Sequence, residues 1–526
     1  MEQHVLPARS VEARKKGRRQ STAPTSSVPA SGTLLERADK NRRTVSPSID
    51  QRKKSKLGQF MTPAPVATFM AGMFPQSNLR ECRLLDAGAG LGALTCAFLD
   101  RWRAGGFSFS DVETTAFEFD DALREHLEAT LEHYADEGHI KAHVIRGDFI
   151  LLTTLAIAEE RAPRLYTHAI LNPPYKKINT GSQHRQALRQ VGIETVNLYT
   201  AFVALAIELM APGGTIVAII PRSFCNGTYY RPFREHLLSK CALRGMHLFD
   251  SRSKAFSDDD VLQENIIIVL ERDGSQGPVT VTTSTDDTFV DLETHSHEFD
   301  RIVLPGDAER FIHVPTSAGH TELEQRASVR HTLVDLGLKV STGPVVDFRL
   351  KDHLRQAPEL GSVPILYPMH FAGKAVTWPV PEGKKANAIM VNDDTMGWLM
   401  PNGFYCVVRR FSSKEERRRI VANVIRPDDF PDGTEFLGLE NHVNVFNEKR
   451  RGLSELLAYG MAAYMNTTAV DEAFRRFSGH TQVNAGDLKT MRYPSRGVLE
   501  ELGRWYKART DATQGELDQQ FKELTA

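Results

Sequence analysis

The 526-residue sequence predicts a doubly wound α/β sheet of seven strands followed by a C-terminal α+β domain. Two observations lead to this prediction. Between residues 84 and 270, short apolar runs alternate with segments of helical periodicity, which is typical of a parallel sheet with helices on both faces. After residues 273–278, Asp-Gly-Ser-Gln-Gly-Pro, the alternation stops and short strands, turns and isolated helices follow. Such a change of pattern indicates a domain boundary.

Each element of the first domain is predicted from its apolar pattern. Strands are expected at residues 83–86, 115–118, 143–145, 169–171, 215–220, 246–249 and 266–270. Helices are expected at residues 91–103, 122–134 and 197–210. Ligands of doubly wound sheets bind beyond the carboxyl ends of the strands, so the residues that directly follow each strand are candidates for a functional site.

Three segments are expected along the chain. Residues 1–50 mix basic residues with Ser, Thr, Pro and Gly without any sustained periodicity, which predicts a disordered basic tail. Residues 51–275 carry the alternating α/β pattern. Residues 276–526 form the second domain.

Composition limits the partners and the compartment. Lys+Arg number 65 and Asp+Glu number 66, so any contact with nucleic acid has to be local. Basic clusters such as Arg409-Arg410 and residues 449–451 are either such contacts or solvated faces. The 5 cysteines lack metal-ligand spacing, so neither a metal site nor a disulfide is expected. Without a long apolar run or a secretory signal, we expect a cytoplasmic protein with no membrane contact.

A glycine-rich turn follows the first predicted strand. It reads Asp86-Ala-Gly88-Ala-Gly90-Leu-Gly, and its glycines allow a ligand to approach the backbone at the start of the next helix. The same turn matches the looser dinucleotide pattern GxGxxA, ending at Ala93, so binding of NAD stays open at this point. Glu118 ends the second strand and could accept both ribose hydroxyls of either cofactor.

Asp148 and Phe149 follow the third predicted strand. The acid can accept a hydrogen bond from an adenine amino group while the aromatic ring covers the base. A helix N-cap and a core phenylalanine are the alternative interpretation of this pair.

The tetrapeptide Asn172-Pro173-Pro174-Tyr175 directly follows an apolar strand. An exocyclic amine of a nucleobase is a poor nucleophile because its lone pair is delocalised into the ring. The side-chain carbonyl of Asn172 and the main-chain carbonyl of Pro173 can accept its N–H groups, while two successive prolines keep the loop rigid. Tyr175 offers a ring for stacking an extruded base. A plain Pro-Pro turn is the alternative interpretation.

In this order the motifs resemble those of the gamma-class adenine-N6 DNA methyltransferases, which are related to TaqI, and most closely the PstI/BsuBI modification enzymes. Residues 58–63, Gly-Gln-Phe-Met-Thr-Pro, are similar to the N-terminal cofactor motif of that family, which implies cofactor contacts for Phe60 and Thr62. The family relationship implies a Rossmann-like methyltransferase sheet followed by a target-recognition domain. The resemblance covers about residues 55 to 500.

The same resemblance assigns roles to further residues. Phe256 would stack on the flipped adenine from the face opposite Tyr175. Residues 411–419 and 479–484 resemble target-recognition segments. DNA contacts are therefore expected from His480, Thr481, Gln482, Asn484, Arg409 and Arg410.

The implied function is methyl transfer from S-adenosylmethionine to N6 of a flipped adenine in double-stranded DNA. Asn172, Pro173, Tyr175 and Phe256 would be catalytic, and Asn172 would also contact the cofactor. We expect a monomer that serves as the modification component of a type II restriction system, with a separately encoded cognate endonuclease; an orphan enzyme without such a nuclease is the alternative.

Other functions stay open from the sequence alone. A protein-glutamine or RNA amino-methyltransferase could use the same loop, because its acceptors suit any planar amine or amide. A bifunctional restriction-modification enzyme is a second alternative, although the residues after Pro427-Asp428 lack the lysine of a nuclease motif. An NAD-dependent oxidoreductase is a third, from the glycine turn alone.

Overall fold

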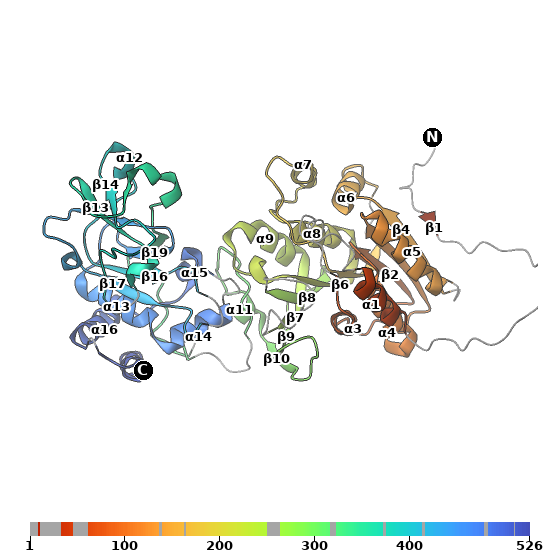
Figure 1. Ribbon diagram of the computed structural model, residues 1–526. Helices are drawn as coiled ribbons and strands as arrows, with labels where there is room; N and C mark the ends of the chain where they lie inside the picture. Colours follow the sequence, from red (N-terminus) through yellow and green to blue (C-terminus); the bar gives the residue numbers. More distant parts are fainter. Residues whose placement is uncertain are drawn as a thin grey trace, which may run out of the picture. The chain divides into compact units, whose positions relative to one another are not determined.

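The computed structural model describes residues 9–10, 33–45, 61–135, 139–161, 165–249, 264–315, 322–323, 325–371, 375–412, 416–477, 482–509 and 511–526. The chain divides into two compact units, Met1–Ala318 and Gly319–Ala526 (Figure 1). Among the described residues, no helix has the length and apolar character needed to cross a membrane.

The first unit is built on one 10-stranded sheet. From edge to edge the strands are β1 (Arg9–Ser10), β4 (Ile140–Arg146), β3 (Asp111–Glu118), β2 (Glu81–Ala87), β5 (Tyr166–Leu171), β6 (Met210–Pro221), β8 (Asn265–Arg272), β7 (Cys241–Phe249), β9 (Val279–Ser284) and β10 (Glu293–His297). The strands from β4 to β6 are parallel, and β8 runs antiparallel between β6 and β7. All seven predicted strands are present, as β2 to β8.

Both faces of this sheet are buried. Neighbouring strand residues alternate between two hydrophobic cores. Leu84 and Val217 belong to one core, whereas their neighbours Leu85, Ile216 and Ala218 belong to the other, on the opposite face of the sheet. One core is covered by α1 (Leu34–Val45), α3 (Ala64–Gly72), α4 (Ala93–Arg101) and α5 (Asp121–Ala135). The other is covered by α6 (Phe149–Ala158), α7 (Gln183–Gln190), α8 (Leu198–Leu209) and α9 (Arg231–Lys240). The apolar character of the strands on both faces therefore has its cause in this double covering.

Two predictions about the ends of the first unit are wrong. The expected disordered tail contains α1, whose Leu35 and Ala38 are buried and which is tied to α4 by a hydrogen bond from the Leu35 backbone N–H to Asp100 Oδ2 (3.1 Å). The rest of residues 1–50, apart from residues 9–10 and 33, lies outside the described part. The domain boundary predicted at residue 275 lies at 318 instead, because β9 pairs with β7 and β10 with β9.

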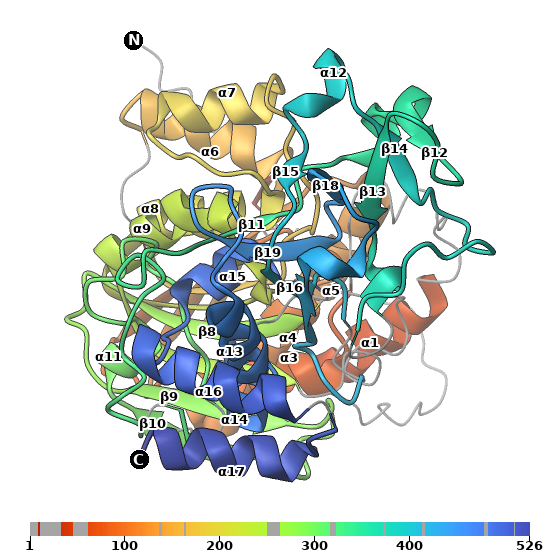
Figure 2. The ribbon, with the colours of Figure 1, turned by 90° about the vertical axis from the view of Figure 1, so that its left-hand side faces the viewer.

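The second unit combines two small sheets with helices. A 4-stranded antiparallel sheet contains β11 (Lys339–Thr342), β19 (Val443–Asn447), β16 (Tyr405–Arg409) and β17 (Ala422–Ile425). A 5-stranded sheet contains β12 (Leu354–Arg355), β14 (Ala388–Met390), β13 (Ser362–Leu366), β18 (Phe436–Leu439) and β15 (Met400–Pro401). Its helices are α12 (Asp393–Met396), α13 (Glu455–Met465), α14 (Thr468–Phe477), α15 (Ala485–Thr490), α16 (Arg496–Ala508) and α17 (Gln514–Leu524). The C-terminal helix α17 contacts α14 and α16 (Figure 2).

Helices α13 and α16 cross at two glycines. A Cβ atom on Gly460 would lie 1.8 Å from the carbonyl oxygen of Leu499, and one on Gly503 would lie 1.9 Å from that of Leu456. The two backbones therefore approach as closely as they do because neither crossing residue carries a side chain.

Candidate active site

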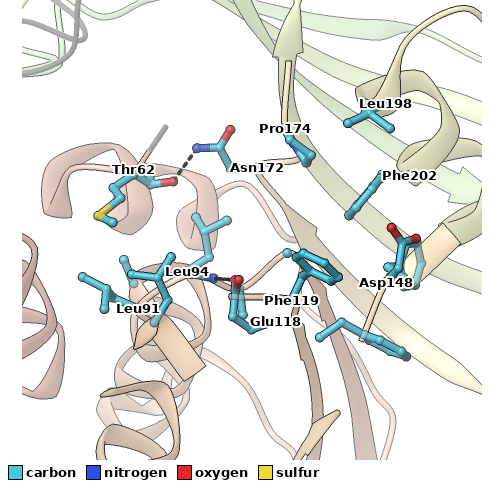
Figure 3. Close-up of a pocket in the computed structure, with 18 of the residues that line it drawn as sticks. Thr62, Leu91, Leu94, Glu118, Phe119, Asp148, Asn172, Pro174, Leu198 and Phe202 are labelled. Atoms are coloured by element: carbon cyan, nitrogen blue, oxygen red, sulfur yellow. Dashed lines mark hydrogen bonds between the residues drawn. The ribbon is translucent and has the colours of Figure 1, made fainter. Parts of the chain in front are cut away.

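A cavity of about 350 Å³ opens at the carboxyl ends of β2, β3, β4 and β5 in the first unit (Figure 3). This is the edge of the sheet where the sequence predicts a site. Its polar lining includes Thr62, Glu118, Asp148, Asn172 and His184. Its apolar lining includes Leu91, Leu94, Phe117, Phe119, Phe149, Leu198 and Phe202. Such a size and such a lining suit a ligand as large as a nucleoside.

The glycine turn after β2 forms one wall. Gly88 and Gly90 line the cavity with φ angles of 81° and 57°, in the left-handed region that glycine adopts without strain. The Gly90 N–H donates to Glu118 Oε2 (2.8 Å) and the Asp120 N–H to Glu118 Oε1 (2.7 Å). Burial raises the pKa of Glu118, although these two backbone N–H groups act to lower it. The turn therefore holds the Glu118 carboxylate at the cavity, as its predicted ribose contact requires.

Asp86 lies outside the lining of the cavity. Its side chain is fully buried, and Asp86 Oδ2 accepts a hydrogen bond from Thr95 Oγ1 (2.7 Å). Burial raises the pKa of Asp86 to about 7. In this structure Asp86 therefore links β2 to α4 beneath the glycine turn.

Asp148 and Phe149 both line the cavity, and Asp148 is also the N-cap of α6. Its Oδ1 accepts from the Leu151 N–H (3.0 Å), and its Oδ2 lies 2.7 Å from His184 Nε2. Burial acts to raise the pKa of Asp148, but the hydrogen bonds from His184 and from the backbone outweigh it and lower the pKa. The hydrogen bond with Asp148 raises the pKa of His184. His184 stands in no recognisable motif, and sequence reasoning missed it.

Asn172 lines the cavity and is held from two sides. Its Nδ2 donates to Thr62 Oγ1 (2.9 Å), which brings together residues 110 positions apart (Figure 3). The Tyr175 hydroxyl lies 3.1 Å from Asn172 Oδ1 and 3.3 Å from the carbonyl oxygen of Ile219, and it can donate to either. Pro174 lines the cavity, whereas Pro173 and Tyr175 do not. The Tyr175 ring packs edge-on against Tyr199, with centroids 6.1 Å apart.

Helix α1 contributes Ala38 and Arg42 to the lining, which sequence reasoning also missed. The helix lies within the segment predicted to be disordered. The one signal available in the sequence was the spacing of Leu35 and Ala38, which places both residues on one helical face; both are buried in the structure.

Four of the predicted site residues lie outside the described residues: Phe60, Phe256, His480 and Thr481. The other predicted DNA contacts are in the second unit and have protein partners. Arg409 pairs with Glu416, and Arg410 donates to Asn441 O (3.1 Å) and to Gln482 Oε1 (3.3 Å). Asn484 is the N-cap of α15, and its backbone N–H and its Nδ2 donate to Asp487 Oδ2 (3.0 and 3.3 Å).

The sequence predicts neither a metal site nor a disulfide, and the described side chains bear on both predictions. In the part of the chain that the structure describes, no group of three or more His, Cys, Asp or Glu side chains could hold a metal ion. All five cysteines are buried and free: Cys82, Cys96, Cys225, Cys241 and Cys406.

Known proteins share this sequence closely. Residues 120–256 match the Eco57I restriction-modification methylase family. The type II methyltransferase M.BsuBI of Bacillus subtilis is 48% identical over 497 residues, which cover 93% of this chain and 98% of that protein. M.PstI of Providencia stuartii is 39% identical over 488 residues, covering 91% and 95%. A tRNA1(Val) (adenine(37)-N6)-methyltransferase of Shewanella sediminis is 27% identical over 183 residues, covering 32% and 64%.

The sheet, its cavity and these relatives define an S-adenosylmethionine-dependent methyltransferase. More particularly, the chain belongs to the type II DNA methyltransferases of restriction-modification systems, the family of M.BsuBI and M.PstI.

The residues present fit this cofactor. The glycine turn leaves the backbone open to a ligand, and the Glu118 carboxylate suits a pair of ribose hydroxyls. Phe149 and Phe202, with ring centroids 5.0 Å apart, supply apolar surface for a base.

Proposed function

We propose that the chain transfers a methyl group to N6 of an adenine flipped out of duplex DNA. The observation that carries this proposal is the Asn172 amide, which is fixed at the cavity by Thr62 and Tyr175. A fixed acceptor beside a nucleoside-sized cavity suits a planar amine that has to be activated. The name of the similar Shewanella enzyme, which specifies adenine N6, supports the same atom.

The activation depends on where the two acceptors lie. Because Thr62 accepts the Asn172 Nδ2–H, the amide is oriented and its Oδ1 can accept an N–H of the substrate amine. The main-chain carbonyl of Pro173 would accept the second N–H, and Pro173 and Pro174 limit the motion of the loop. Two acceptors draw the nitrogen lone pair out of conjugation with the ring, which makes the amine a better nucleophile.

The cofactor, when bound, supplies a methyl group on a positively charged sulfonium. Glu118 would accept the ribose hydroxyls, Asp148 the adenine amino group, and Thr62 and Asn172 would border the methyl donor. Holding the amine and the methyl group in line converts a bimolecular step into one within a complex, which supplies much of the rate.

Phe256, Gln482, Asn484, Arg409 and Arg410 remain proposed DNA contacts, together with His480 and Thr481. Phe256 would stack on the flipped adenine with Tyr175, and the others would contact the duplex. We also propose that the protein acts as a monomer in the cytoplasm, beside a separately encoded endonuclease.

The test compares the wild-type protein with Asn172→Ala. Duplex DNA, RNA and a protein with an exposed glutamine are incubated with methyl-labelled S-adenosylmethionine, and digested products are separated by mass spectrometry. We expect N6-methyladenine from duplex DNA alone, and at least a ~1,000-fold lower rate in Asn172→Ala, which still binds the cofactor. N4-methylcytosine as the product, or full turnover by the variant, would contradict the proposal.

A further inference from the structure

The second unit contains a larger cavity, of about 660 Å³, which we call the cationic pocket. Three of its lining residues are basic and none is acidic: Lys339, Arg450 and Lys489. Its other lining residues are Thr332, Leu333, Val334, Leu338, Val340, Ser341, Thr342, Pro344, Met400 and Asn447. A concave surface that gathers cations without acids attracts anions.

The three cations come from different elements that meet at one place. Lys339 begins β11 and lies opposite Asn447 in the pairing of β11 with β19. Arg450 lies in the turn that directly follows β19. Lys489 lies on α15, which contacts β11. All three side chains are exposed, so an anion can reach them.

The turn that carries Arg450 is strained. Lys449 and Arg450 have φ angles of 49° and 66°, the one adjacent pair of non-glycine residues with positive φ in the described part of the chain. The N–H groups of Glu448 and Arg451 donate to each other's carbonyl oxygens (3.0 and 2.8 Å), which closes a two-residue hairpin. Such hairpins favour Asn-Gly at their two central positions, because L side chains are costly there.

Neighbouring groups hold this strained turn in place. The Arg450 N–H donates to Asn447 Oδ1 (3.0 Å), and Arg450 Nη2 donates to the carbonyl oxygen of Gly397 (2.9 Å). The nearest acid in sequence, Glu448, pairs with Arg496 (2.9 Å). Backbone strain that surrounding contacts maintain is typical of functional positions. Here the strained turn places Lys449 and Arg450 next to the cationic pocket, at two positions where Asn-Gly would be favoured.

We propose that the cationic pocket and the Lys449-Arg450 turn bind phosphodiester groups of duplex DNA. This inference rests on DNA being the substrate of the enzyme. Contacts of this kind fix the position of the protein on the duplex and carry no sequence information. Their binding energy comes largely from the release of counterions, so it falls as salt rises. The pocket would therefore add equally to the affinity for every DNA sequence.

The first test uses Lys339→Ala/Lys489→Ala and a matched control, Arg504→Ala/Lys522→Ala. The control removes two exposed cations of the same unit that do not line the pocket. Binding of a cognate and an unrelated duplex is measured by fluorescence anisotropy at several salt concentrations. For the pocket variant we expect about tenfold weaker binding of both duplexes, and a plot of log K against log salt less steep by about 1.8. The control keeps the wild-type slope.

A second variant tests the turn. Lys449→Asn/Arg450→Gly keeps the hairpin, because Asn-Gly is its preferred sequence, and removes both charges. Thermal unfolding confirms that the variant folds. We expect its plot of log K against log salt to be less steep than that of the wild type, to a degree similar to that of the pocket variant. Wild-type slopes in both variants, or a loss confined to the cognate duplex, would overturn the inference. So would equal competition by millimolar inorganic phosphate, which would assign the pocket to a free anion. Methyl transfer to DNA by the wild-type protein is recorded separately, so that failure of the proposed function is distinguishable.

Discussion

His184→Ala should change how cofactor affinity depends on pH. His184 Nε2 lies 2.7 Å from Asp148 Oδ2, the acceptor that we assign to the adenine amino group. The cofactor therefore has to compete with His184 for that oxygen. The pKa of His184 is raised and that of Asp148 is lowered, so both are ionised around pH 6 and the imidazole becomes neutral as the pH rises.

The free energy of the His184–Asp148 contact follows from how far the two side chains are exposed to solvent. The side chains of His184 and Asp148 are 32% and 28% exposed, so solvent screens the pair and we assign it about 1 kcal/mol. This corresponds to a factor of about five in affinity at 25 °C. We expect His184→Ala to bind S-adenosylmethionine about fivefold more tightly than the wild type near pH 6, and this advantage to be smaller near pH 8.5, where more of the imidazole is neutral.

Isothermal titration calorimetry of both proteins at the two pH values measures this difference. The comparison is made between proteins at each pH, because the cofactor itself titrates. A ratio of affinities that stays the same at both pH values would refute the competition. Weaker binding by His184→Ala near pH 6 would assign His184 to cofactor binding instead.

The His184–Asp148 pair also contributes to the stability of the fold, and the two pKa shifts give the direction in which this contribution changes with pH. The folded-state pKa of His184 is raised, so its contribution is complete below about pH 6.5 and is lost as the pH rises through that raised pKa. The pKa of Asp148 is lowered, so its contribution is present above about pH 3.8 and is lost as the pH falls. His184→Ala should therefore lower the melting temperature of the unliganded protein more near pH 6 than near pH 8.5.

Three further predictions concern buried groups. Asp86→Asn should raise the melting temperature more at pH 8 than at pH 5, because the pKa of Asp86 is raised to about 7 and an ionised buried carboxylate destabilises the wild type at high pH. Tyr175→Phe should lower kcat for methyl transfer roughly tenfold with an unchanged KM for the cofactor, since only the hydroxyl near Asn172 is lost. Gly460→Ala should cost about 3 kcal/mol in urea unfolding, because its Cβ would meet the Leu499 carbonyl oxygen at 1.8 Å, whereas Gly497→Ala on α16, with nothing within 4 Å, should not destabilise.

The central sheet could be predicted because each strand has its own apolar run. Strands β2 to β8 each contain a short apolar run, and in β5, β6 and β8 nearly every residue of that run is buried, because helices cover both faces of the sheet. Three strands of the sheet were missed: β1, within the segment predicted to be disordered, and β9 and β10, which lie near the other edge and are rich in Thr, Ser and His. Their polar pattern resembles that of a new domain, which is why the boundary was placed too early.

Helix α1 could not be predicted from its composition. Seven of its twelve residues, in Leu-Leu-Glu-Arg-Ala-Asp-Lys-Asn-Arg-Arg-Thr-Val, are charged or amide side chains, and isolated helices of this length are marginal in water. Its stability comes from burying Leu35 and Ala38 against the α/β unit and from the bond of its backbone to Asp100. Apart from the spacing of Leu35 and Ala38 on one helical face, the local sequence gives no sign of these tertiary contacts.

In the candidate site, too, some features follow from the local sequence and others from contacts between residues far apart in the chain. Glu118 ends a strand, and Gly88, Gly90, Asp148 and Asn172 follow strands, so the rule that ligands bind at strand ends was enough to predict that they line one cavity. What turns Asn172 into an oriented acceptor is its bond to Thr62, from a segment 110 residues earlier. The Asn-Pro-Pro-Tyr loop would thus supply the acceptors that we propose, but the orientation of Asn172 depends on Thr62, which precedes β2. A sequence motif for the loop alone therefore predicts the chemistry of the site, whereas its geometry requires the folded unit.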